Sequence, residues 1–202
     1  MLKAIGHGFS NLASFDGRDA RQAFWFWVLF LYIVTTVLSM VVTMPMTMQT
    51  MMTGVQQGIA QAGNPDRTAA DMAARTAIMD SMTQYLGWMV WLSIATTVIL
   101  IVGLAASFVR RLHDSGLPGW WALLPVGLQA YSASTIPGQI DRMQASILAS
   151  MSGDPVAAIS TLKGAFGAGP VAAWLAILIV IVLGVRKSTP GPNRYGAAPF
   201  VA

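Results

Sequence analysis

Three stretches of about 20 or more residues contain no charged side chain and are almost entirely apolar: residues 24–43, 86–109 and 166–185. A helix of about 20 apolar residues spans the hydrocarbon of a bilayer, where only helices and closed barrels satisfy their own backbone. The whole chain has 55% hydrophobic and 10% charged residues, and its mean hydropathy is +0.60. This composition is too apolar for a soluble globular domain. The sequence therefore predicts an all-α integral membrane protein.

A fourth apolar stretch, residues 120–137, is interrupted by Pro125, Gly127 and Gln129. Charge decides whether it crosses, because basic residues near the ends of spans are retained on the cytoplasmic side. With four crossings, eight of the 12 basic residues fall on one side of the membrane: Lys3, Arg18, Arg21, Arg110, Arg111, Arg186, Lys187 and Arg194. We therefore predict four transmembrane helices, at about 24–43, 86–109, 120–137 and 166–185, with both termini cytoplasmic.

This topology leaves one short cytoplasmic loop and two longer external loops around a single membrane domain, residues 1–202, whose cytoplasmic tail is residues 186–202. The first external loop, Pro45–Gln84, is predicted to contain a helix that begins at Asn64-Pro65. Asp154-Pro155 marks a short helix in the second loop in the same way.

The net charge of +4 and the pI of about 9.9 do not indicate nucleic-acid binding, because the membrane topology accounts for the excess of basic residues. The chain has no cysteine, which excludes disulfides and thiolate metal sites. We expect no cofactor.

Three segments on the predicted cytoplasmic side contain most of the polar residues that could form a functional site. They are Gly17-Arg-Asp-Ala-Arg21, Arg110-Arg-Leu-His-Asp-Ser-Gly116 with Gly119-Trp-Trp121, and Asn193-Arg-Tyr-Gly196. In order and spacing they resemble the signature of the domain-of-unknown-function family 805 (DUF 805), a set of small bacterial inner-membrane proteins. The resemblance implies the bacterial inner membrane but no activity. The chain departs from the family pattern at Leu117-Pro118, and its external loops are longer.

We expect the three segments to converge in a cytoplasmic cluster in which Asp114 neutralises one arginine and the other guanidiniums offer paired donors to a phosphate or carboxylate. Its candidate binding residues are Arg18, Arg21, Arg110, Arg111, His113, Asp114, Asn193, Arg194 and Tyr195. The ligand would be an anionic lipid headgroup, a small anion or a partner protein. The alternative is that these residues only hold the loops together.

Two further functions stay open. A membrane enzyme would use His113 with Asp114 as an acid–base pair, but no nucleophile accompanies them, so we do not predict an enzyme. A transporter component for a small solute or metal would use the methionine run at the outer end of the first span, since thioethers bind Cu(I). This run is Met40, Met44, Met46, Met48, Met51 and Met52. Flexible apolar packing explains these methionines more simply, so no metal site is predicted. Close helix contacts at Gly103 also make a homo-oligomer possible.

Overall fold

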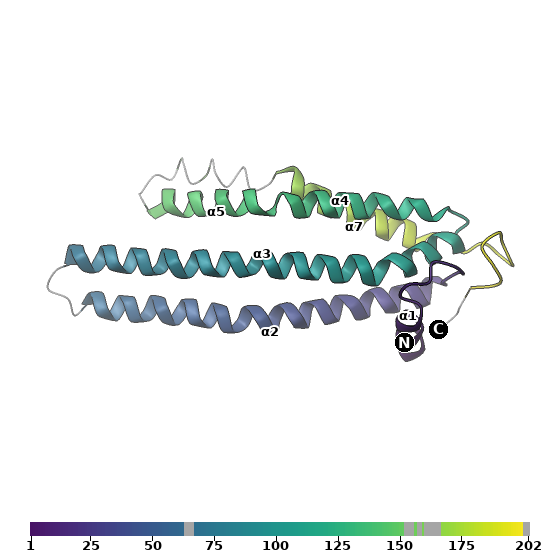
Figure 1. Ribbon diagram of the computed structural model, residues 1–202, viewed down its shortest axis with the longest axis horizontal. Helices are drawn as coiled ribbons and strands as arrows, with labels where there is room; N and C mark the ends of the chain where they lie inside the picture. The colour runs from purple at the N-terminus through teal and green to yellow at the C-terminus, as the bar shows by residue number, and fades with distance from the viewer. Residues whose placement is uncertain (63–66, 152–155, 157–158, 160–166, 200–202) are drawn as a thin grey trace. The chain divides into compact units, whose positions relative to one another are not determined.

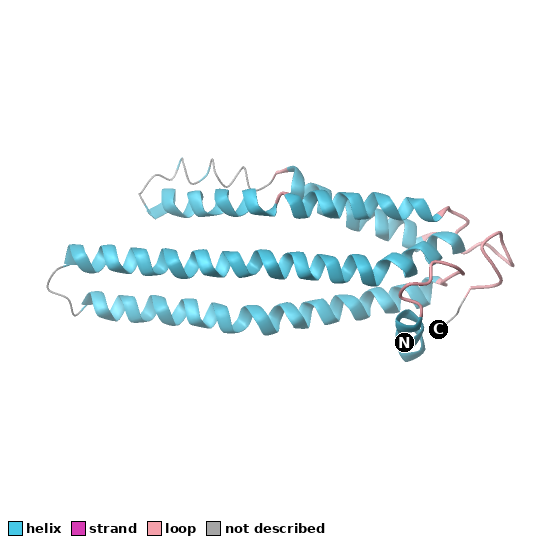
Figure 2. Ribbon diagram, in the orientation of Figure 1, coloured by secondary structure: helices cyan, strands magenta, loops and turns pink. Residues whose placement is uncertain are grey.

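The computed structural model describes residues 1–62, 67–151, 156, 159 and 167–199, and these residues form helices joined by turns (Figures 1 and 2). The elements in chain order are α1 (Leu2–Ser10), α2 (Arg21–Ala62), α3 (Arg67–Asp114), the 3₁₀ helix η1 (Gly119–Ala122), α4 (Leu123–Ser134), α5 (Ile136–Met151) and α7 (Ala168–Val185). The predicted helix starts at Asn64-Pro65 and Asp154-Pro155 lie outside the described residues.

Within the described residues, three helices are long and apolar enough to cross a membrane: α2, α3 and α7. They contain the predicted spans 24–43 and 86–109 and nearly all of the span 166–185. The predicted span 120–137 is divided differently, because η1 and α4 are followed by Thr135 and then by α5. The 12 residues of α4 alone rise only about 18 Å, which is less than the hydrocarbon thickness, so a crossing here would have to include η1 or the first turns of α5 as well.

The first predicted external loop, Pro45 to Gln84, is helical throughout its described part, which is more helix than the sequence predicted. α2 continues through Pro45 to Ala62, and α3 begins at Arg67. Proline costs about 3 kcal/mol inside a helix, but the methionine, glutamine and alanine residues that follow it favour helix. The threonine hydroxyls here bond back to their own helix; for example, Thr47 donates to the carbonyl of Thr43 and Thr53 to that of Gln49. Strong local propensity therefore outweighs the single proline.

The chain divides into two compact units, residues 1–35 with 95–202 and residues 36–94. In the first unit α4 lies beside α7 (Figure 1). A buried apolar cluster of Phe24, Phe108, Leu112 and Ala122 lies where α2, α3 and η1 meet, and Leu183 of α7 packs against it. The polar site described below lies next to this apolar cluster.

The aromatic residues at the start of α2 pack inside the first unit more than they face lipid. Phe24 is fully buried, and Trp27 is 2% exposed and donates its indole N–H to the carbonyl of Gly103 at 2.8 Å. Both rings therefore lie in the interior of the first unit. They hold α2 against α3.

A close approach between α7 and α2 depends on Gly184. A Cβ atom built on Gly184 would lie 2.8 Å from Cε1 of Phe24 and 3.2 Å from Cζ2 of Trp25. Real carbon atoms do not approach so closely without displacing their neighbours. Gly184 therefore sets the distance between the end of α7 and the start of α2.

We expect Gly184→Ala to destabilise the protein by about 1–3 kcal/mol, because the added methyl group overpacks the contact with Phe24. Thermal unfolding in detergent measures the effect. Gly127→Ala in α4 is the matched control, since nothing lies within 4 Å of its Cβ position, and it should be neutral or stabilising. Equal unfolding temperatures for the two variants would contradict the close approach.

Candidate functional site

The Arg110-Arg-Leu-His-Asp-Ser-Gly116 motif forms the carboxyl-terminal end of α3. Gly116 has a φ of 76°, its N–H donates to the carbonyl of His113 at 3.1 Å, and that of Leu117 donates to Leu112 at 2.9 Å. These two bonds make a Schellman cap, in which glycine adopts the left-handed conformation that ends the helix. The contact between Leu117 and the buried cluster around Leu112 completes the cap. The motif thereby places Arg110, Arg111 and Asp114 on the last turns of α3.

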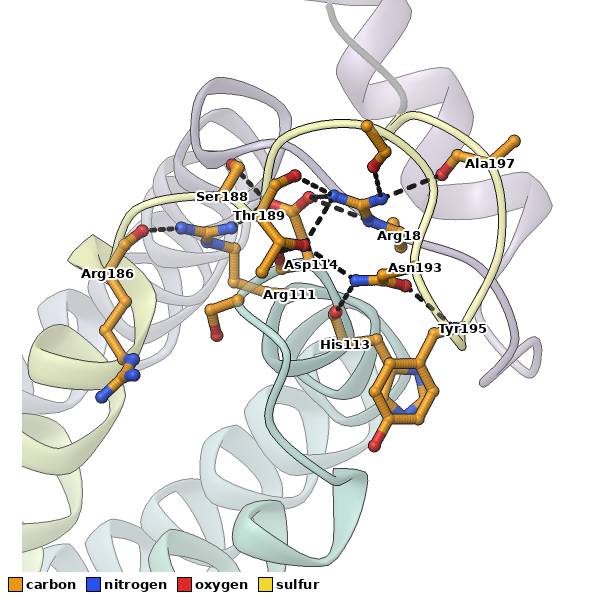
Figure 3. Close-up of polar contacts among 12 residues, drawn as sticks. Arg18, Arg111, His113, Asp114, Arg186, Ser188, Thr189, Asn193, Tyr195 and Ala197 are labelled. Carbon is orange, nitrogen blue, oxygen red and sulfur yellow. Dashed lines mark hydrogen bonds and ion pairs between the residues drawn. The ribbon is translucent and has the colours of Figure 1, made fainter.

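Asp114 is the centre of a buried ion network at this end of α3 (Figure 3). Its side chain and that of Arg111 are both 0% exposed. Oδ1 accepts hydrogen bonds from Nη2 of Arg18 at 2.9 Å and from Nε at 3.2 Å. Oδ2 accepts from Nη1 of Arg111 and from the hydroxyl of Ser188. One carboxylate thus joins the amino-terminal segment, α3 and the tail.

All five N–H groups of Arg18 have acceptors. Besides Asp114, they reach the carbonyl oxygens of Thr189 at 2.7 Å, Gly191 at 2.6 Å and Ala197 at 3.3 Å. Arg18 is only 4% exposed, and a buried guanidinium is tolerated when its charge is paired and its donors are satisfied. The tail therefore wraps around Arg18 and leaves it no open donor.

Arg111 caps α7 from a different helix. Its Nε donates to the carbonyl of Gly184 at 3.0 Å, and its Nη2 donates to the carbonyl of Arg186. The last carbonyl groups of a helix lack partners within the helix and carry partial negative charge, which a cation stabilises. Arg111 thus fixes the end of α7 to the end of α3.

A second ion group lies one residue away along α3. Arg110 donates from Nε to Oδ2 of Asp19 at 3.0 Å, and its Nη1 donates to the carbonyls of Asn11, at 2.7 Å, and Ser14. Asp19 also accepts from the hydroxyl of Ser107 at 3.0 Å and from Nε2 of His7 at 3.0 Å. This group holds α1 and the amino-terminal segment against α3.

The Asn193-Arg-Tyr-Gly196 segment docks the tail on the end of α3. Asn193 donates to the carbonyl of His113 at 2.9 Å and to the hydroxyl of Thr189 at 2.9 Å, and its Oδ1 accepts the N–H of Tyr195 at 2.9 Å. The Tyr195 ring stacks on the His113 ring with centroids 3.9 Å apart and planes 6° apart (Figure 3). The guanidinium of Arg194 lies over the Tyr195 ring, 4.6 Å from its centroid.

The structure brings together most of the residues that the sequence predicts for the site. Six of them share one set of contacts: Arg18, Arg111, His113, Asp114, Asn193 and Tyr195. Arg110 belongs to the second group, with Asp19, and Arg21 and Arg194 are exposed. Five polar partners were not predicted from the sequence: His7, Asp19, Ser107, Ser188 and Thr189.

The buried part of the site is a closed structural network rather than an open cavity. Three buried arginines face two buried aspartates, and oxygen atoms accept hydrogen bonds from every side-chain nitrogen of Arg18 and Arg111 and from Nε and Nη1 of Arg110. Among the described residues, no group of three or more His, Asp or Glu side chains is placed to hold a metal ion. In the methionine run, Met44, Met48 and Met51 are exposed, whereas Met46 is half-buried.

Comparison with known proteins gives one match, the family model described as a protein of unknown function (DUF805), over residues 12–197. The match covers nearly the whole chain, so the protein belongs to this family. No curated protein and no solved structure matches the chain.

We expect Asp114→Asn to destabilise the protein by about 3–5 kcal/mol, because it leaves two buried guanidiniums without their shared counter-charge. Thermal unfolding in detergent measures the loss. Asp16→Asn is the matched control: Asp16 is exposed, and its change should stay within about 0.5 kcal/mol. If both variants unfold alike, Asp114 is not the centre of the network.

Proposed function

We propose that this DUF805 member is a non-catalytic protein of the bacterial inner membrane that crosses it four times and holds a basic cytoplasmic surface against anionic lipid headgroups. The basic surface is Arg21, Arg186, Lys187 and Arg194, all of which are exposed. The buried network fixes the position of these four residues, and it does not bind the ligand itself.

The contrast between buried and exposed arginines supports this division of labour. Arg18, Arg110 and Arg111 are at most 4% exposed, and aspartate and backbone oxygens occupy their described donors. An added phosphate would have to displace those acceptors. The exposed cations need no such displacement, so we assign ligand contact to Arg21 and Arg194 among the predicted site residues.

Each exposed cation lies close in sequence or space to a residue of the network; Lys187, for example, precedes Ser188, whose hydroxyl donates to Asp114. The carbonyl of Arg186 accepts a hydrogen bond from Arg111, while the Arg186 side chain points away from the network (Figure 3). Arg194 precedes Tyr195, which stacks on His113. Arg21 starts α2 three residues before Phe24, which contacts the end of α7 at Gly184. The four charges therefore belong to one end of the first unit.

Anionic lipid is the ligand that this arrangement fits best. Basic residues next to the cytoplasmic ends of spans face a leaflet rich in negative headgroups, and each contributes about 1 kcal/mol of attraction. Exposed guanidiniums also suit the paired oxygens of a phosphate. An acidic partner protein would use the same charges, and the lipid experiment below distinguishes the two.

We expect the double variant Arg21→Gln with Arg194→Gln to bind phosphatidylglycerol about 30-fold more weakly, from the loss of two contributions of about 1 kcal/mol each. Native mass spectrometry of the purified protein, titrated with phosphatidylglycerol or phosphatidylcholine, measures bound lipid. The control is Arg75→Gln with Arg142→Gln, which removes two exposed charges from the predicted external side.

Retention of phosphatidylglycerol by both double variants would contradict the lipid proposal. So would equal binding of phosphatidylcholine to the unmodified protein.

The four-crossing topology has its own test. Because the chain contains no cysteine, the labelling of a single introduced cysteine reports the side of the membrane on which that residue lies. We expect Ala60→Cys and Asp141→Cys to react with a membrane-impermeant maleimide in intact cells. Leu2→Cys and Ala197→Cys should react only after permeabilisation. All four positions are exposed. Labelling of Leu2→Cys without permeabilisation, or protection of Asp141→Cys, would overturn this topology.

A further inference from the structure

An uninterrupted apolar stripe runs along the exposed face of α2 in the second unit. Its residues are spaced alternately four and three apart, and each is between 53% and 72% exposed. We call it the α2 stripe: Val37, Val41, Met44, Met48, Met51 and Val55.

The opposite face of α2 is the one that meets α3. A narrow groove in the second unit is lined by Met46, Gln49, Thr50 and Thr53 of α2 and by Ser81, Gln84, Tyr85 and Trp88 of α3. At 100° per residue, Met46, Thr50 and Thr53 lie about half a turn away from Met44, Met48 and Met51. The hairpin therefore has polar groups between its helices and its apolar stripe outside, so its own α3 does not cover the stripe.

Lipid cannot cover the whole stripe either. α2 has 42 residues, which gives a length of about 63 Å, against about 30 Å for the hydrocarbon of a bilayer. If the span begins at the aromatic residues near Phe24, it ends near Thr43. Beyond that point the stripe alternates with threonine and glutamine, which is the pattern of a helix in water with one apolar face.

We propose that the α2 stripe packs against the same stripe of a second copy of this chain, as a parallel two-stranded coiled coil. The alternating spacing of four and three residues is the heptad pattern of such a seam, with Val41, Met48 and Val55 at position a and Val37, Met44 and Met51 at position d. Val41 and Val55 are β-branched residues at position a, which is where two-stranded parallel coiled coils favour them.

The membrane and the charge pattern both favour a second copy as the partner. Copies of one chain insert in the same direction, so their α2 helices run parallel and equal residues meet across a two-fold axis. No charged residue occurs between Gln22 and Ala62, so two copies of this helix meet without like-charge repulsion. This inference depends on α2 crossing the membrane and is independent of lipid binding.

Cysteine crosslinking tests the interface, because every disulfide formed must come from the introduced residue. We expect Met48→Cys and Met51→Cys, oxidised in native membranes, to give disulfide-linked dimers. A disulfide requires Cβ atoms about 3.5–4.5 Å apart, and equal seam positions of a parallel pair face each other across the two-fold axis. Gln49→Cys is the matched control: Gln49 is exposed but lies off the stripe, so it should give little or no dimer.

A second measurement keeps the proposal testable without oxidation. Met48→Gln with Met51→Gln should lower the dimer fraction of the protein in lipid nanodiscs, as seen by mass photometry, while Gln49→Ala should not. The proposal is overturned if Gln49→Cys crosslinks as well as Met48→Cys, if the stripe cysteines link only to a different protein, or if the unmodified protein is monomeric throughout.

Discussion

The shared counter-ion at Asp114 is the constraint on which the first unit depends. One buried carboxylate neutralises Arg18 from the amino-terminal segment and Arg111 from α3, and it also accepts the hydroxyl of Ser188 from the tail. Buried charges are tolerated only when they are paired and their donors are occupied, so these three segments hold one another in place. The second group, around Asp19 and Arg110, repeats the arrangement for α1. The polar residues at this end of the first unit therefore act first as structure.

The long helices place a different demand on the second unit. A helix of 42 or 48 residues is much longer than a bilayer is thick, so a substantial part of α2 and α3 lies in water. Two helices alone bury little surface, and here hydroxyl and amide side chains line the groove between them together with Met46, Tyr85 and Trp88. The apolar side chains of α2 face outward, where an isolated chain would leave them in contact with water. The two units thus differ: paired charges hold the first together, whereas the second presents an apolar face of α2 that its own α3 does not cover.

The sequence predicts the helical membrane class and the convergence of Arg18, Arg111, His113, Asp114, Asn193 and Tyr195, because hydropathy fixes the spans and charge sorts the connecting segments by side. It does not predict the course of α2 beyond Thr43, since Pro45 and the following threonine and glutamine residues resemble a loop when tertiary context is absent. Nor does it predict which aspartate pairs with which arginine: Asp19 and Asp114 lie on the same side of the membrane, and only the turn of α3 directs Arg110 to one and Arg111 to the other. Phe24 and Trp27 show a similar limit, because an aromatic residue near a span end serves an interface or a core equally well.

The capping of α7 by Arg111 has a consequence for the order of events during synthesis. Arg111 leaves the ribosome more than 70 residues before the carbonyls of Gly184 and Arg186 and the tail that surrounds Arg18. Until that last part of the chain emerges, Asp114 is the one partner of the Arg111 guanidinium. Such a group is stable while water solvates it, but its burial is unfavourable. A chain that stops before α7 therefore leaves Arg111 with Asp114 alone, without the two carbonyl groups that its remaining nitrogens contact.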